Sequence, residues 1–410
     1  MLADPVTYRN GVPYEELARR RRYQPVGWVA EPELRYHSES DGERVRRGSG
    51  YWAVTRHETV VAASRDPARF SSAAQGAFLV DPRTPEDLER ARQLLVNMDA
   101  PAHSRIRRHV TAAFTPREVA ALAGNIRAHA EDLVAKAVAD GAFDAVAALA
   151  AELPLLVLAD LLGVPRADRG LLFGWSNNLV GFDDPDYGGG SVDAYRRTFK
   201  EAFGYAREMA TQRRRQPRGD LVSRLVTSEV DGQPLTDAEF CQLWLLLVIA
   251  GNETTRHLLS GSLLALAERP DQCAKLVADP ALTPRAVDEL LRWVSPIMQF
   301  RRTSTVDTEL AGQPIRAGDK VVLYYVSANR DADVFTEPDR LDLSRRPNPH
   351  LAFGVGPHFC LGSHLAHLEA QTLLDTLRPY LSRLRVTGPV VRLQSTFMNG
   401  IKALPMELAG

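Results

Sequence analysis

The chain has few cysteines, few lysines and no long apolar run. Three cysteines in 410 residues are too few for a disulfide-stabilised scaffold and are usual for a reducing compartment. The longest apolar run, Leu243–Ala250, has 8 residues, whereas a membrane-spanning helix needs about 20. Charged residues between Asp4 and Arg22 also interrupt any apolar leader. We therefore expect no secretion, no membrane span and a cytoplasmic protein.

Neither sign of charge dominates. Lys plus Arg number 50 and Asp plus Glu 51, so no net field would attract nucleic acid or an anionic membrane. Only 5 of the 50 cations are lysines, and the arginines are spread along the whole chain, which indicates a compositional bias and not a phosphate-binding surface. No repeat, low-complexity linker or domain joint is visible, so we expect one domain over residues 1–410.

The residues that are present favour helices. Thr236 and Glu239 are spaced as a capping box, and the helix that they open should stop after about Arg269, before Pro270. Alternating residues predict a short strand at 51–55, and a β-rich patch is expected at 303–310 and 320–326 with a turn at Gly312 between them. Helical spacing of apolar residues recurs over 85–97, 117–140, 144–163, 191–215 and 361–380. The expected fold class is mainly α with a minor β region.

The segment Phe353–Gly362 could carry chemistry. It reads Phe-Gly-Val-Gly-Pro-His-Phe-Cys-Leu-Gly, and its glycines allow a tight loop whose backbone can approach a flat group. Cys360 precedes a predicted helix, where the helix dipole and free N–H groups stabilise a thiolate and suit it as a metal ligand. Cys241 and Cys273 lack this setting and are expected to be buried structural residues.

A polar segment follows the apolar run of the long helix. In Ala250-Gly251-Asn252-Glu253-Thr254-Thr255, an acid stands next to an alcohol in mid-helix. Thr254 could bond back to the Ala250 carbonyl, which locally opens a helix, and Gly251 would let another group approach the backbone. We expect this segment to face a functional space and not solvent.

Two further pairs lie at helical spacing. Glu289 and Arg292 stand at i and i+3 within apolar surroundings, which indicates a buried ion pair. His103 and Arg107 stand four apart and present two aligned donors, which suit a carboxylate.

The decapeptide around Cys360 resembles the cysteine loop of the cytochrome P450 family, F-G-x-G-x-H-x-C-x-G, and the similarity runs from Tyr51–Thr55 to Asn399–Lys402. The resemblance implies the P450 fold, a triangular-prism-like single domain with heme b between the long oxygen-activation helix and the helix after the cysteine loop. It also implies that Cys360 is the thiolate ligand of the heme iron, that Gly362 lies at the cofactor, and that His358 donates to a heme propionate.

The same resemblance gives roles to the other motifs. Glu253 and Thr254 would pass protons to dioxygen, beside the cofactor-contacting Ala250 and Gly251. The resemblance implies that three cationic residues bind the heme propionates, namely His103, Arg107 and Arg302, with Arg301 as the alternative to Arg302. It implies that Glu289, Arg292 and Arg340 form a structural network.

The resemblance also implies substrate contact for Val248, Ala250, Ile297, Met298, Phe397 and Met398. Segments 72–98 and 172–195 would form a variable lid, with mobility at 181–190.

The implied function is a monooxygenase that inserts one oxygen atom of O2 into a C–H bond of an apolar small molecule of the steroid, terpenoid, fatty acyl or polyketide type. No flavin domain or P-loop is visible, so electrons would come from a ferredoxin and its reductase. We expect a monomer. His367 stands where many bacterial relatives carry Arg, which bears on the docking of the electron donor.

Three alternatives stay open. A peroxide-driven enzyme of the same fold would not need Glu253 and Thr254, and a catalytically idle heme-binding or lipid-binding protein would not need the intact motifs. A structural zinc site could use His358, Cys360, His364 and His367, but it would leave the glycines unexplained.

Overall fold

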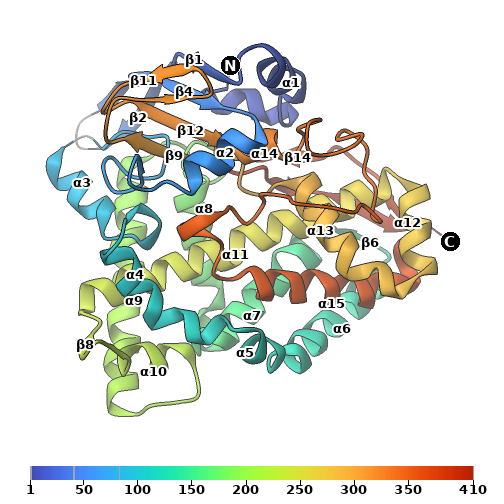
Figure 1. Ribbon diagram of the computed structural model, residues 1–410. Helices are drawn as coiled ribbons and strands as arrows, with labels where there is room; N and C mark the ends of the chain where they lie inside the picture. Colours follow the sequence, from blue (N-terminus) through green and yellow to red (C-terminus); the bar gives the residue numbers. More distant parts are fainter. Residues whose placement is uncertain (1, 40–41, 83, 410) are drawn as a thin grey trace.

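The computed structural model describes residues 2–39, 42–82 and 84–409, and most of the chain is helical (Figure 1). The α-helices are α1 (Tyr14–Tyr23), α2 (His57–Ser64), α3 (Pro85–Arg92), α4 (Ala102–Thr111), α5 (Pro116–Ala120), α6 (Ala123–Asp140), α7 (Glu152–Leu162), α8 (Arg169–Val180), α9 (Val192–Arg215), α10 (Leu221–Val226), α11 (Asp237–Ala267), α12 (Pro270–Ala278), α13 (Thr283–Val294), α14 (Tyr325–Ala328) and α15 (Ser363–Leu381). The strands are β1 (Val26–Val29), β2 (Glu33–Ser38), β3 (Gly42–Arg47), β4 (Tyr51–Val54), β5 (Phe70–Ser71), β6 (Ala142–Asp144), β7 (Glu229–Val230), β8 (Gln233–Pro234), β9 (Gln299–Ser304), β10 (Thr308–Leu310), β11 (Gln313–Ile315), β12 (Lys320–Tyr324), β13 (Leu384–Val386), β14 (Val391–Arg392), β15 (Ile401–Ala403) and β16 (Pro405–Leu408).

Helix α11 crosses the middle of the molecule (Figure 1). The predicted capping box is present, because the Thr236 side chain accepts the Glu239 N–H while the Glu239 carboxylate accepts the Thr236 N–H. The helix has 31 residues and ends at Ala267, two residues before the expected end. Arg269 has an extended φ of −130°, since a residue that precedes proline is disfavoured in the α conformation. Helices α7, α8, α9, α13 and α15 pack around it.

A five-stranded sheet lies near the N-terminus, with the strand order β1-β4-β12-β9-β5 (Figure 1). Strand β12 is the central strand and pairs in parallel with β4 and antiparallel with β9, and β9 pairs on its other side with β5. The β-rich patch expected over 303–310 is divided between two strands. β9 ends at Ser304, whose hydroxyl donates to the Val306 carbonyl, and β10 starts a separate hairpin with β11.

The main apolar core lies between the helices, and smaller clusters line the sheet. As predicted, Cys241 and Cys273 are buried. In the part of the chain that the structure describes, no helix combines the length and the hydropathy needed to cross a bilayer.

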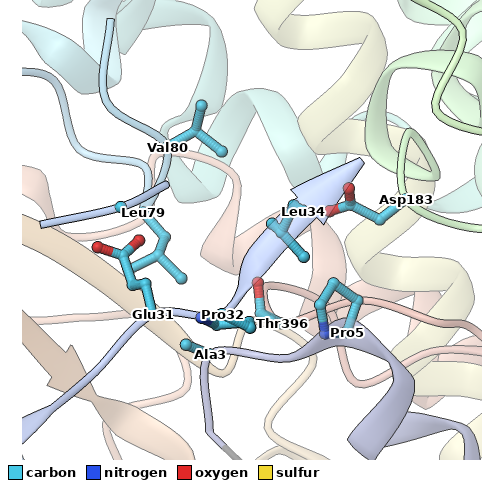
Figure 2. Close-up of a pocket in the computed structure, with 10 residues that line it drawn as sticks. Ala3, Pro5, Glu31, Pro32, Leu34, Leu79, Val80, Asp183 and Thr396 are labelled. Carbon is cyan, nitrogen blue, oxygen red and sulfur yellow. The ribbon is translucent and has the colours of Figure 1, made fainter. Parts of the chain in front are cut away.

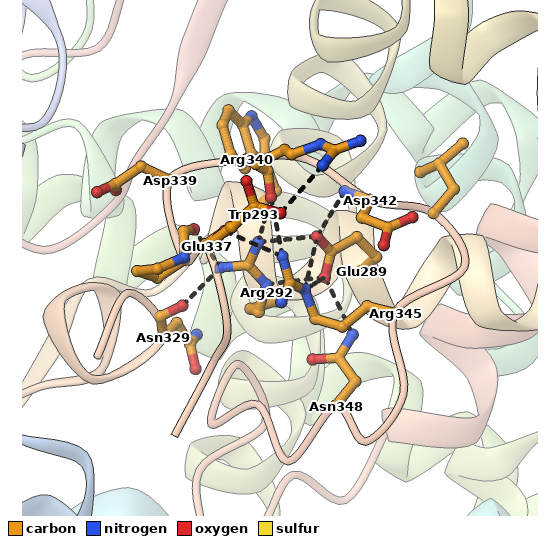
Figure 3. Close-up of polar contacts among 12 residues, drawn as sticks. Glu289, Arg292, Trp293, Asn329, Glu337, Asp339, Arg340, Asp342, Arg345 and Asn348 are labelled. Atoms are coloured by element: carbon orange, nitrogen blue, oxygen red, sulfur yellow. Dashed lines mark hydrogen bonds and ion pairs between the residues drawn. The ribbon is translucent and has the colours of Figure 1, made fainter. Parts of the chain in front are cut away.

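Figure 3 shows the buried ion pair between Glu289 and Arg292 on α13. Two nitrogens of Arg292 donate to the two Glu289 oxygens at 2.8 Å, and neither side chain has measurable exposure. Arg292 also donates to the carbonyls of Asn329 and Pro338 at 2.8 Å. The pair therefore fastens α13 to the irregular segment that leads to the cysteine loop.

The third side chain of this network is not the expected Arg340. Arg345 Nε donates to both Glu289 oxygens at 3.1 Å, and Asn348 donates to one of them at 3.2 Å (Figure 3). The Arg340 side chain is exposed and pairs with Glu337, three residues earlier, while only its backbone carbonyl accepts from Arg292. The prediction failed because the segment coils without regular periodicity, so spacing does not reveal which arginine turns inward.

Candidate functional site

The cysteine loop packs tightly against the end of α2. Gly356 has a φ of +80°, and a β-carbon there would lie 2.7 Å from the Ser64 carbonyl oxygen, so only glycine fits. The Cys360 N–H donates to the Phe353 carbonyl at 2.9 Å, which closes the loop just before α15. Burial raises the pKa of the Cys360 thiol, while the Gly362 N–H and the Arg107 guanidinium act in the opposite direction. The thiol would therefore deprotonate only with further stabilisation, which a bound metal cation supplies.

Four nitrogen-bearing side chains gather beside this loop, namely His103, Arg107, Arg302 and His358. The His103 and His358 rings lie 4.4 Å apart between centroids, and Arg107 Nη2 donates to the Phe359 carbonyl at 2.7 Å. Burial, followed by the positive charge of Arg302, lowers the pKa of His358 to about 3. Burial and the nearby Arg107 also lower the pKa of His103.

Among the described residues, no carboxylate bonds to any of these four side chains. The nearby Asp99 carboxylate is occupied by the backbone N–H groups of Ser72 and Ala73 and by the Ser71 hydroxyl. His103 Nε2 is buried and has no hydrogen-bond partner in the part of the chain that the structure describes. A cluster of this kind is incomplete without an anion, and the carboxylates of a heme supply one.

The centre of α11 carries an accessible strip within a buried helix. Ala250 is exposed and Gly251 and Thr254 are half-buried, whereas the segment from Thr255 to Ser260 is buried. Thr254 Oγ1 donates to the Ala250 carbonyl at 2.7 Å, so the predicted back-bond is present, and the helix continues through it. α11 packs against α15, which follows Cys360, so the strip and the cysteine loop belong to elements in contact.

Unlike the accessible strip formed by Ala250, Gly251 and Thr254, the Glu253 side chain is fully buried. Its Oε1 accepts from Ser176 Oγ at 3.0 Å and from Asn252 Nδ2 at 3.3 Å, and its Oε2 pairs with Arg256. Burial raises the pKa of Glu253, and the charge of Arg256 opposes this rise. Sequence reasoning did not find Ser176, because nothing in the pattern of α8 distinguishes it from a core residue.

The predicted substrate-contacting residues differ in burial. Ile297 and Phe397 are half-buried, whereas Val248, Met298 and Met398 are enclosed by the core. Ile297 and Met398 are joined by an antiparallel backbone bridge. A substrate contact by the three enclosed side chains stays a prediction.

An aromatic cluster brings together three segments that sequence reasoning did not connect. The Phe397 ring lies 5.3 Å from both Phe78 and Phe300, and Phe78 lies 6.1 Å from Phe300. All three rings are half-buried. Phe300 stands two residues before Arg302 on β9, so both side chains leave the same face of the strand, a signal that the sequence did offer.

A small pocket of about 20 Å³ lies next to this cluster along the chain (Figure 2). Leu79 and Thr396, which line it, are the chain neighbours of Phe78 and Phe397. The 181–190 segment contributes Asp183, and Lys402 pairs with the next residue, Asp184, at 2.8 Å. The other lining residues are Ala3, Pro5, Glu31, Pro32, Leu34, Gly48 and Val80.

The residues of the zinc alternative do not converge. His358 Nε2 lies 3.2 Å from Ser72 Oγ, whereas His367 Nε2 lies 3.3 Å from Asp288 Oδ1. Over residues 2–39, 42–82 and 84–409, no three His, Cys, Asp or Glu side chains are arranged to hold a metal ion together. Burial lowers the pKa of His367, and Asp288 opposes this effect.

The fold is mainly helical, and its central helix carries an acid next to an alcohol. A cysteine in a glycine-rich loop lies beside a cluster of nitrogen-bearing side chains that could bind an anion. These features are typical of a heme-thiolate protein. Comparison with known proteins agrees. A family model described as Cytochrome P450 matches residues 277–389. The chain is 38% identical over 402 residues to a steroid C26-monooxygenase of Mycolicibacterium smegmatis, with 97% of this chain and 91% of that protein covered.

Two further relatives extend this result. A methyl-branched lipid omega-hydroxylase of Mycobacterium tuberculosis is 42% identical over 364 residues, with 88% of this chain and 84% of that protein covered. A solved Mycobacterium marinum cytochrome P450 in complex with pseudoionone has a TM-score of 0.88 at 37% identity, with 98% of this chain and 97% of that chain covered. The chain therefore belongs to the cytochrome P450 family. It is a heme b monooxygenase of apolar substrates that takes its electrons from redox partners.

Proposed function

We propose that Cys360 is the thiolate ligand of the heme iron and that His103, Arg107, Arg302 and His358 hold the heme propionates. The observation that carries this proposal is the cluster of four nitrogen-bearing side chains with no carboxylate bonded to them among the described residues. The Gly362 N–H and the Arg107 charge favour the Cys360 thiolate. Ala250 leaves room at the helix surface for a flat group, because it is exposed and its side chain is small, whereas a β-carbon on Gly251 would lie 3.2 Å from Leu158 Cδ1.

When bound, the heme and its thiolate supply the activation of dioxygen and the transfer of one oxygen atom to a C–H bond. Burial raises the pKa of the Glu253 carboxyl group while the charge of Arg256 opposes this rise, and a buried carboxyl group that can take up and release a proton suits a proton donor. The Thr254 hydroxyl hydrogen is committed to the Ala250 carbonyl, so the lone pairs of Oγ1 remain to accept a hydrogen bond on the open side of α11. Glu253 delivers the proton and Thr254 orients the group that receives it.

We further propose that the substrate carries a branched aliphatic end, as in a steroid side chain or a methyl-branched lipid, and that this end reacts. The relatives at 38% and 42% identity are a steroid C26-monooxygenase and a methyl-branched lipid omega-hydroxylase. The half-buried Phe78, Phe300, Phe397 and Ile297 offer an apolar wall for such a group.

For electron supply, we propose a ferredoxin and its reductase, acting on a monomeric enzyme in the cytoplasm. Three free cysteines fit a reducing compartment. The test is turnover of cholest-4-en-3-one and of a methyl-branched fatty acid with a ferredoxin, its reductase and NADPH. Hydroxylated product at a terminal carbon supports the proposal. If product forms only with hydrogen peroxide, the enzyme is peroxide-driven and the proposed electron supply is wrong. If neither substrate gives product, the proposed substrate class is wrong.

A further inference from the structure

His257 is a buried histidine that the mechanism above does not use. Its side chain has no measurable exposure, and both ring nitrogens lack a hydrogen-bond partner among the described residues. A β-carbon on Gly400 would lie 2.7 Å from both Cε1 and Nε2 of the ring, so the backbone of this glycine lies directly against the imidazole. An unpaired buried polar group destabilises a folded protein, so a role beyond filling space is expected.

The carboxylate of Glu253 lies close to His257 Nε2. The distance from Nε2 to Glu253 Oε2 is 3.6 Å, which is longer than a hydrogen bond but short enough for one to form after a small side-chain movement. The same oxygen is now paired with Arg256. Two nitrogen donors are therefore close to Glu253 Oε2. Arg256 forms an ion pair with this oxygen, whereas His257 Nε2 is too distant for a hydrogen bond.

The two donors lie on either side of Glu253 around the axis of α11. With 3.6 residues per turn, Arg256 projects about 160° away from Thr254 around the helix axis, whereas His257 projects only about 60° away. Glu253 projects about 100° from Thr254 on the same side as both. A carboxyl group that turns from Arg256 to His257 therefore turns toward Thr254, the residue that faces the accessible strip.

We infer that His257 is a second positioning residue for Glu253, which holds the carboxyl group through Nε2–H when that group turns from Arg256 toward Thr254. The inference rests on the proposed proton-donor role of Glu253. The charged groups that act on the imidazole are Glu253 and Arg256, both on α11. Burial and Arg256 keep the ring neutral, so it offers one N–H, and the nearby carboxylate favours that hydrogen on Nε2.

Three substitutions separate this role from simple packing. His257→Gln places an amide N–H near the Nε2 position, His257→Asn places one near Nδ1, and His257→Leu has no donor. Product formed per NADPH consumed is measured in the purified holoenzyme with its electron-transfer proteins. We expect the product formed per NADPH to fall about 10-fold in the Asn and Leu variants, because a hydrogen bond to a charged group is lost. In the Gln variant it should stay near the wild-type value.

Ser262→Ala is the matched control, because Ser262 is also buried on α11 and, among the described residues, its hydroxyl bonds only to the Leu258 carbonyl of the same helix. Gly400→Ala is a second test that keeps the histidine but displaces its ring, and it should also lower the ratio. The reduced carbon monoxide spectrum reports whether each variant retains native heme. Tight coupling in the Leu, Asn and Gly400→Ala variants would overturn the role of His257 alone, whereas a wild-type enzyme without product would overturn the proposed function instead.

Discussion

Glu253 and Thr254 are neighbours in sequence but face opposite environments. The Glu253 carboxylate is fully buried and bonded to Ser176 and Arg256, whereas the half-buried Thr254 hydroxyl donates to the Ala250 carbonyl at 2.7 Å. The acid is therefore shielded from the space that the alcohol faces. A proton can pass between them only after the Glu253 side chain turns or through a bridging group, so the timing of that movement would control proton delivery.

Thr254→Ala should uncouple NADPH consumption from product formation. Without Oγ1, nothing on the accessible strip orients the proton that arrives from Glu253, so activated dioxygen leaves as peroxide. We expect product per NADPH to fall by about 10-fold or more and hydrogen peroxide to rise in proportion. Product analysis gives the product formed per NADPH, and a catalase-coupled oxygen electrode gives the hydrogen peroxide. A tightly coupled Thr254→Ala enzyme would contradict the assignment.

Arg302→Gln and Arg301→Gln should affect different properties. Arg302 lies in the cluster with His103 and His358, whereas Arg301 pairs with Asp81 at 2.6 Å. We expect Arg302→Gln to accelerate heme release to apomyoglobin by about 10-fold, since a charged hydrogen bond contributes about 1.5–3 kcal/mol. Arg301→Gln should lower the melting temperature but leave the heme-release rate unchanged. The reverse pattern would assign the propionate to Arg301.

Arg345→Met should destabilise the fold far more than Arg340→Met. Arg345 is buried against Glu289, and removing one member of a buried ionic network costs about 3 kcal/mol or more. Arg340 makes an exposed pair with Glu337, and such pairs contribute less than about 1 kcal/mol. Urea titration of the two holoenzymes measures the free energies of unfolding, and equal losses would show that the network does not depend on Arg345.

Glu369 on α15 should make the protein less stable as pH rises. It is buried, its Oε2 has no hydrogen-bond partner among the described residues, and burial raises its pKa to about 8. The folded state therefore keeps a proton that the unfolded state releases above about pH 4.5, so this group lowers the free energy of unfolding between about pH 4.5 and 8. Glu369→Gln should remove that slope, and its stability gain over wild type should grow up to pH 8. A gain that is independent of pH would contradict the raised pKa.

The sequence was most informative where short-range chemistry decides the structure. The Thr236 capping box located the start of α11, and the glycines before Cys360 indicated a tight loop, because both depend on residues within one turn of each other. Arg345 and Ser176 were missed because they reach their partners across 56 and 77 positions of the chain. The Phe78–Phe300–Phe397 cluster was missed for the same reason, since it forms only after β9 and two loops are folded together.

The most direct test of the account is the absorption spectrum of the purified protein, reduced and exposed to carbon monoxide, for the wild type and for Cys360→Ala. The account predicts a strongly red-shifted Soret band in the wild type, the mark of a thiolate opposite the carbon monoxide, and its loss in the variant. An unchanged band in Cys360→Ala, or a wild-type protein without any heme band, would contradict the assignment of Cys360 and the proposed chemistry that depends on it.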